Sequence, residues 1–117
     1  MGTIRNRVTL VHHYSFDEIT KLRDDAIETF NKAADGWFDN IDIVGPIMIS
    51  PFNAEYTFMI QGDCSKNGWA PSEKFIDIRM EWCKKHKNDG AAIVIVNLGE
   101  DYPASIDFDS MEEYGGK

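Results

Sequence analysis

The 117-residue sequence has few cysteines and a shortage of positive charge. Only two cysteines occur, Cys64 and Cys83, which are too few for the disulfide framework of a small secreted domain. Twelve Lys and Arg side chains stand against 20 Asp and Glu, which gives a net charge of −8. This imbalance argues against direct binding of nucleic acid through phosphate contacts and against docking on an anionic membrane.

Long hydrophobic runs are also missing. The longest, Ala91 to Val96, is far shorter than the roughly 20 residues that span a bilayer. The start of the chain has no leader pattern, so we expect a soluble, cytoplasmic protein with reduced thiols. With 43% hydrophobic residues, no repeat and no linker, residues 1–117 are predicted to form one domain, in which about 111–117 are a frayed tail.

The sequence lacks the motifs that announce a nucleotide or metal site. Neither G-x-G-x-x-G nor G-x-x-x-x-G-K-[ST] occurs, so the familiar phosphate-binding loops are excluded. Cys64, Cys83 and His86 could ligate a metal, but zinc sites usually show two close pairs of ligands, and this chain has no C-x-x-C. We therefore expect no cofactor and no metal, and interpret Cys83 as a small buried hydrophobe.

Candidate catalytic groups have simpler structural interpretations. His12 and His13 are adjacent on a predicted strand, so their side chains point to opposite faces and cannot converge on one site. The basic run Lys84 to Lys87 is typical of a helix C-terminus, where cations offset the helix dipole. Asp24, Asp25 and Glu28 belong to the solvent face of a helix. No catalytic residue is assigned, and a non-enzymatic protein is expected.

Hydrophobic periodicity predicts the first elements. Residues Arg7 to Tyr14 are rich in strand formers, and the capping box Ser15 to Glu18 then starts a helix that ends at Asp35-Gly36. Its core-facing stripe is Ile19, Leu22, Ala26, Phe30 and Ala33. Ile41 to Ser50 is predicted to be an edge or bulged strand because Pro46 cannot donate to a ladder, and Glu55 to Gln61 is the next strand.

The stretch Ser72 to Lys87 fits two structures. Apolar and charged residues alternate from Ile76 to Trp82, as in a strand, yet the same residues share one broad face of a helical wheel that only Arg79 interrupts. Pro71-Ser72 suits a helix start and Asn88 to Gly90 its end, so we favour a helix, with a long strand as the alternative.

Two more strands complete the pattern. Ala91 to Leu98 is apolar on both faces, so it should be covered on both edges or both sides, and Ser105 to Asp109 is a short closing strand. The order β-α-β-β-α-β predicts an α+β, ferredoxin-like sandwich, with two helices on one face of a mainly antiparallel sheet and a short fifth strand.

Three segments of the chain share a pattern with a known family: Asn6 to Leu10, the Gly68 to Pro71 segment before the second helix, and the acidic turn before the last strand. In these segments the chain resembles the YubB-type ferredoxin-like proteins of phages and plasmids. The segment from Gly62 to Gly68 departs from the family pattern, which places the Trp-x-Pro directly after the third strand. The resemblance implies this fold and an origin on a mobile element, and it supplies no catalytic residue.

Acidic side chains gather in the last part of the chain. Asp107 and Asp109 are predicted to project from one face of the closing strand, at the strand period of two. A row of carboxylates can imitate a phosphate backbone and compete for a basic groove, although acidic side chains also protect an exposed sheet edge. Trp69 is a further contact candidate, because exposed tryptophans favour interfaces. The candidate partner-binding residues are Glu100, Asp101, Asp107, Asp109, Glu112, Glu113 and Trp69.

The predicted function is a small acidic protein-binding domain from a phage or other mobile element. It would act as an inhibitor or nucleic-acid mimic on a host nucleic-acid-handling or defence protein with a basic surface, in the host cytoplasm. Two alternatives remain open: a small-molecule-binding or enzymatic domain with a pocket near His12 and His13, or a structural homodimer that pairs exposed sheet edges.

Overall fold

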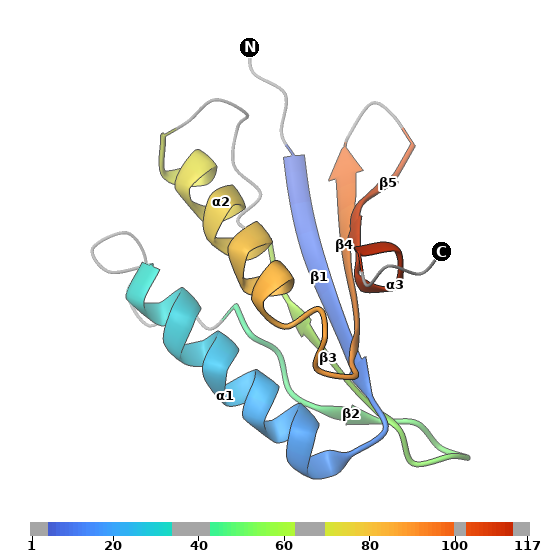
Figure 1. Ribbon diagram of the computed structural model, residues 1–117. Helices are drawn as coiled ribbons and strands as arrows, with labels where there is room; N and C mark the ends of the chain where they lie inside the picture. Colours follow the sequence, from blue (N-terminus) through green and yellow to red (C-terminus); the bar gives the residue numbers. More distant parts are fainter. Residues whose placement is uncertain (1–4, 34–42, 63–69, 100–102, 114–117) are drawn as a thin grey trace.

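The computed structural model describes residues 5–33, 43–62, 70–99 and 103–113. Eight elements follow one another along the chain (Figure 1): β1 (Arg5–His13), α1 (Phe16–Ala33), β2 (Met48–Ile49), β3 (Tyr56–Ile60), α2 (Ala70–Lys85), β4 (Ala92–Gly99), β5 (Ser105–Asp109) and α3 (Ser110–Glu113).

The strands form one open antiparallel sheet in the order β2-β3-β1-β4-β5. Helices α1 and α2 lie on the same face of this sheet, and the short α3 lies beside β4 and β5 (Figure 1). The α+β class, the two helices on one face and the fifth strand are therefore as predicted from the sequence.

The first helix begins where the capping residues place it. The Ser15 hydroxyl accepts a hydrogen bond from the Glu18 amide (3.3 Å), and the Ser15 carbonyl accepts the first helical bond from Ile19 (3.0 Å). The predicted stripe faces the sheet, where Ile19, Ala26 and Phe30 are completely buried. They meet Val11, Phe58, Ile60, Ile93 and Ile95 from the sheet in one continuous core.

The stretch from Ser72 to Lys87 is helical, because α2 covers Ala70–Lys85. Its buried side chains include Phe75, Trp82 and Cys83, which belong to the predicted apolar face. Arg79, which interrupts that face in the sequence, is buried as well. Lys84 and Lys85 occupy the last turn, where their charges offset the helix dipole.

The second predicted strand is much shorter than the sequence indicates. Only Met48–Ile49 pair as β2 at the edge of the sheet, whereas Val44 makes an isolated bridge with Ile60. The Gly45 amide donates to the Met59 carbonyl at 2.7 Å, but Pro46 has no amide to continue the ladder. The edge position agrees with the prediction made from Pro46, and residues 41–42 lie outside the described residues.

β4 runs between β1 and β5, so both of its edges are paired. Ile93 and Ile95 point into the core, whereas the alternate residues Val94 and Val96 remain partly exposed on the other face. The apolar sequence of β4 predicts that either its two edges or its two sides are covered. The structure shows the first arrangement, because β1 and β5 cover both edges.

The C-terminal segment forms a helical turn where the sequence predicts a tail from residue 111. The Asp109 carboxylate accepts a hydrogen bond from the Met111 amide (3.0 Å) and so caps α3. The buried Ser110 hydroxyl accepts from the Ile93 amide (2.9 Å) and donates to the Ala91 carbonyl (3.3 Å). These bonds attach α3 to the start of β4, and residues 114–117 lie outside the described part of the chain.

Candidate functional site

The sheet face opposite α1 and α2 exposes large apolar side chains. Leu10 of β1 is 40% exposed, Met59 of β3 is 38%, Leu98 of β4 is 44% and Ile106 of β5 is 63%. Four different strands contribute, so the exposure is a property of the face and not of one irregular residue. Exposed apolar patches of this kind on a monomer mark interaction sites more often than scattered single residues do.

The strand register makes these side chains neighbours. Leu10 pairs with Met59 on one side and with Val94 on the other, and Val96 pairs with Ile106. Residues two apart along a strand share a face, so Leu98 follows Val96 on the same face of β4. We call this set, Leu10, Met59, Val94, Val96, Leu98 and Ile106, the open-face patch.

The sequence contained a signal for this patch. β4 is apolar at every position from Ala91 to Val96, which predicts that neither face of that strand is polar. Sequence reasoning predicted both helices on one face of the sheet, but it assigned the apolar residues of this strand to coverage at its edges or sides and not to binding.

Asp107 and Asp109 do not share a face, contrary to the prediction. Phe108 pairs with Ile95, but Ile106 pairs with Val96, so Asp107 is the extra residue of a β-bulge. The Asp107 carboxylate bonds the Arg7 guanidinium (Nε–Oδ2, 3.0 Å), and Arg7 projects from the helix-covered face of β1 together with Thr9 and Val11. A bulge resets the two-residue alternation, which the sequence pattern alone did not reveal.

The remaining candidate partner-binding residues lie on β5, on α3 or outside the described part of the chain. Asp109 pairs with Val94 and so lies at the β5 end of the row Met59–Leu10–Val94. Glu112 is exposed on α3, and Glu113 belongs to the same helix. Trp69, Glu100 and Asp101 lie outside the described residues. The structure thus places one of the candidate acids, Asp109, at the β5 end of the open-face patch.

His12 and His13 point to opposite faces, as the strand period requires. His12, half exposed on the open face, contacts the Thr57 hydroxyl through Nδ1 (2.7 Å) and the Glu55 carboxylate through Nε2 (2.5 Å). His13 is buried; its Nδ1 accepts from the Ser15 amide at 2.9 Å and its Nε2 lies 3.3 Å from the Asp89 carbonyl. The two imidazoles therefore do not form one site.

A hollow of about 300 Å³ lies near these histidines without including them. Gly90, Ala92, Ser110 and Met111 are among the residues that line it. Ala92 of β4 pairs with His12 of β1. The His12 imidazole, however, contacts the Thr57 hydroxyl of β3, and β3 and β4 lie on opposite sides of β1.

His86 belongs to a polar cluster that ties α2 to α1. Its Nε2 lies 2.8 Å from Asp25 of α1, and its Nδ1 lies 2.6 Å from Asp89. Trp82 Nε1 also donates to Asp25 at 2.9 Å. Burial raises the pKa of Asp25, but the hydrogen bonds from His86 and Trp82 and the nearby charge of Lys85 outweigh it and lower that pKa overall.

The predicted solvent face of the first helix thus contains a residue with a structural role. Asp25 bonds His86, which lies sixty-one residues later in the chain, and no local sequence pattern predicts a contact between residues so far apart.

Cys83 lies in the hydrophobic core, where its side chain is not available as a metal ligand. Burial raises the pKa of its thiol to about 12. Among the residues the structure describes, no group of three or more His, Cys, Asp or Glu side chains could hold a metal.

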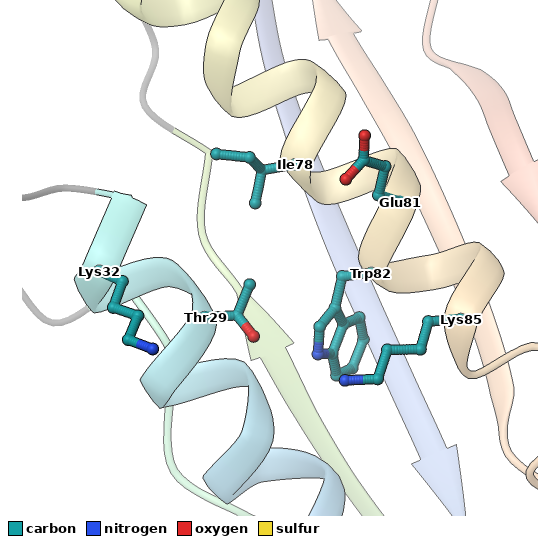
Figure 2. Close-up of a pocket in the computed structure, with 6 residues that line it drawn as sticks. All are labelled: Thr29, Lys32, Ile78, Glu81, Trp82 and Lys85. Atoms are coloured by element: carbon teal, nitrogen blue, oxygen red, sulfur yellow. The ribbon is translucent and has the colours of Figure 1, made fainter.

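A hollow of about 550 Å³ separates the outer surfaces of α1 and α2. Thr29 and Lys32 line it from α1, and Ile78, Glu81, Trp82 and Lys85 line it from α2. Figure 2 shows Trp82 and Thr29 facing one another across it, with Lys32 and Lys85 on either side. Sequence reasoning missed this groove, because no local motif indicates which solvent faces of two helices will meet.

The sequence matches no model of a known protein family, and no curated protein matches it. In the described ranges, no helix is both long enough and apolar enough to cross a membrane. Function must therefore be argued from the surfaces described above.

Proposed function

We propose that the protein is a non-enzymatic protein-binding domain and that the open-face patch is its binding surface. The observation that carries the proposal is the exposure of large apolar side chains from four strands on one sheet face. Water-exposed apolar area of this kind gains free energy when a partner covers it. The other face of the same sheet belongs to the buried core, so the strands that carry the patch are held in place before binding.

The partner we propose has an apolar contact area bordered by basic side chains. Asp109 borders the open-face patch at β5, Glu112 is exposed on α3, and the whole chain carries a net charge of −8. Opposite charge at the rim would speed association and exclude acidic partners. A protein that handles nucleic acid has such a surface, which supports a role as an inhibitor or nucleic-acid mimic in the host cytoplasm.

For the architecture we propose a ferredoxin-like sandwich extended by β5. The element order β-α-β-β-α-β, the wholly antiparallel pairing and the two helices on one face support it. The resemblance to YubB-type proteins of phages and plasmids is compatible with this architecture, and an origin on a mobile element remains part of the proposal.

The two alternatives make different use of the structure. A catalytic or small-molecule site built on both His12 and His13 is disfavoured, because His13 is buried behind the sheet and both its ring nitrogens are engaged. The homodimer alternative pairs exposed sheet edges, and the edge strands of the sheet are β2 and β5. A homodimer that instead covers the open-face patch would use that patch for assembly. Sedimentation equilibrium distinguishes this case, because the chain alone has a mass of 13.3 kDa.

The test compares a patch variant with a matched control. Leu10→Thr combined with Ile106→Thr removes apolar area from the open face and keeps strand-forming residues. Phe52→Ser removes an apolar ring that is 95% exposed in the turn between β2 and β3, outside the patch. Proteins captured by the wild-type chain are identified by mass spectrometry, and each purified partner is titrated with all three forms by calorimetry.

We expect the patch variant to bind a true partner at least about tenfold more weakly, as loss of a central contact does. Phe52→Ser should bind like wild type, and Glu112→Lys should mainly slow association and reduce its salt dependence. A partner that binds the patch variant as tightly as wild type would refute the proposed surface. A wild-type dimer that the patch variant dissociates would replace the proposal by the homodimer.

A further inference from the structure

We propose that the partner segment on the open-face patch is an amphipathic α-helix that carries Lys or Arg on one flank of its apolar stripe. The proposal rests on the proposed function of that patch, and it adds the secondary structure and the charge of the segment that binds there. Three features of the open face support it: the pairing of the strands beneath the patch, the shape of the apolar area and the sign of its charges.

The strands beneath the middle of the patch have no edge to offer to a partner backbone. β3, β1 and β4 are each paired on both sides, so a segment lying over them meets side chains and not a hydrogen-bonding strand edge. An extended segment would bury its own amides and carbonyls against apolar side chains without partners, which costs free energy. A helix satisfies these groups within itself and can cover the patch without that cost.

The apolar area is a band that runs obliquely across the sheet. Met59 of β3 pairs with Leu10, Leu10 pairs with Val94, and Ile106 of β5 pairs with Val96. The ends of the band, Met59 and Ile106, are therefore three strand spacings and one two-residue step apart. With about 4.8 Å between strands and about 3.3 Å per residue, the band is roughly 16 Å long. Three turns of a helix have about the same length.

Polar side chains border this band on one side. In the next row of the open face His12 pairs with Thr57, and its half-exposed imidazole bonds the Thr57 hydroxyl and the Glu55 carboxylate. A partner sheet would spread over the whole face and bury these polar groups. A helix, about 10 Å wide, covers the band and leaves them in water.

The described part of the open face carries carboxylates and neither lysine nor arginine. Glu55 lies beside His12 with 44% of its side chain exposed, and the partly exposed Asp109 stands at the β5 end of the patch. Arg7 of β1 projects from the other face, where it is paired with Asp107. Both open-face carboxylates lie on the His12 side of the apolar band, so we expect the cations of the partner on one flank of its stripe.

The experiment titrates the ¹⁵N-labelled protein with three synthetic peptides of about 18 residues, a length that permits a helix in water. The first has Leu at helical spacing, Lys on one flank and Gln elsewhere. The second has Glu in place of Lys, and the third is the Lys peptide with a central proline that breaks the helix. Amide shifts of the protein locate each bound peptide, and circular dichroism measures its helicity.

We expect the Lys peptide to give saturable shifts at Leu10, Val96 and Ile106 and to become more helical on binding. The Glu peptide should bind about threefold or more weakly, because two exposed carboxylates then face like charge. The proline peptide should bind at least about tenfold more weakly, because it cannot present one continuous stripe.

Asp109→Asn removes one open-face charge and keeps a side chain that can cap α3. It should weaken the Lys peptide about two- to fivefold and reduce its advantage over the Glu peptide. Asp24→Asn is the control, because it removes an exposed acid from α1 on the helical side of the molecule and should change neither peptide.

Equal binding of the Lys and Glu peptides, or of the Lys and proline peptides, would overturn the proposed occupant. If Leu10→Thr combined with Ile106→Thr still weakens a purified partner in that case, the proposed function stands and only the basic helix is refuted. Shifts of the Lys peptide confined to α1 would also overturn it, since they would show attraction to the net charge of −8 alone.

Discussion

The buried guanidinium of Arg79 donates a 2.8 Å hydrogen bond to the hydroxyl of Thr9, which joins the middle of α2 to the central strand β1. The same guanidinium donates to the carbonyls of Ile60 (3.1 Å) and Gln61 (2.7 Å), where β3 ends. It also lies 5.5 Å from the centre of the Phe30 ring of α1. One side chain thus connects both long helices with two strands.

Replacing Arg79 with Met should lower the free energy of unfolding by about 2 kcal/mol or more, because the buried oxygen atoms of Thr9 and Ile60 and the partly buried carbonyl of Gln61 lose a charged donor. Urea denaturation monitored by circular dichroism measures the change. Lys84→Met is the control, since it removes an exposed cation from the same helix. Equal stability of Arg79→Met and wild type would show that the guanidinium does not hold α2 on the sheet.

Asp25 should make stability depend on pH in a predictable direction. Its folded pKa is lowered below the ordinary aspartate value of about 3.8, so its ionised form stabilises the fold above that value. This contribution is lost as the pH falls from about 5 through the lowered folded pKa. Denaturant titrations of wild type and Asp25→Asn at several pH values should give a difference that shrinks on acidification.

Asp24→Asn controls for the loss of one acidic charge from the same helix, since Asp24 is exposed. Its difference from wild type should be much smaller at neutral pH than that of Asp25→Asn. A difference for Asp25→Asn that grows on acidification would contradict the hydrogen-bonded cluster with His86 and Trp82.

The Cys83 thiol should resist alkylation and disulfide exchange in the folded protein. It is completely buried, and burial raises its pKa to about 12 against the lowering influence of Arg79 and Thr9, so the reactive thiolate is scarce at neutral pH. In a Cys64→Ser variant, Ellman's reagent should detect Cys83 only after denaturant is added. Rapid labelling without denaturant would mean that the core opens readily around α2.

Asp107 and Asp109 should differ in their effect on stability. Asp109→Ala removes the cap of α3, and helix caps are usually worth about 1 kcal/mol. Asp107→Ala removes a partly exposed ion pair with Arg7, which is worth about 1 kcal/mol at most. Thermal unfolding of the two variants should rank Asp109→Ala as the less stable. The reverse order would argue against capping of α3 by Asp109.

Predictions that depend on local sequence agree closely with the structure. The Ser15 cap, the stripe from Ile19 to Phe30 and the closing strand Ser105 to Asp109 all occur where predicted, because hydrogen bonds and periodicity within a few residues determine them. The return bond of the predicted capping box is replaced, because the Ser15 amide donates to His13 and not to Glu18. The second strand was predicted too long. Its residues have strand propensity, but Pro46 interrupts the ladder and only Met48–Ile49 pair with β3.

The sequence by itself determined the first helix, the separation of His12 from His13 and the net charge of −8, because these depend on composition and on the fixed periods of helix and strand. It left Ser72 to Lys87 open between helix and strand, and it did not indicate α3. Only the tertiary structure decided which residues meet. The bulge at Asp107, the Asp25–His86 contact, the burial of Arg79 and the open-face patch all arise from strand register and helix packing between distant segments. Such pairings depend on how whole faces fit together, and a local pattern carries no information about its distant partner.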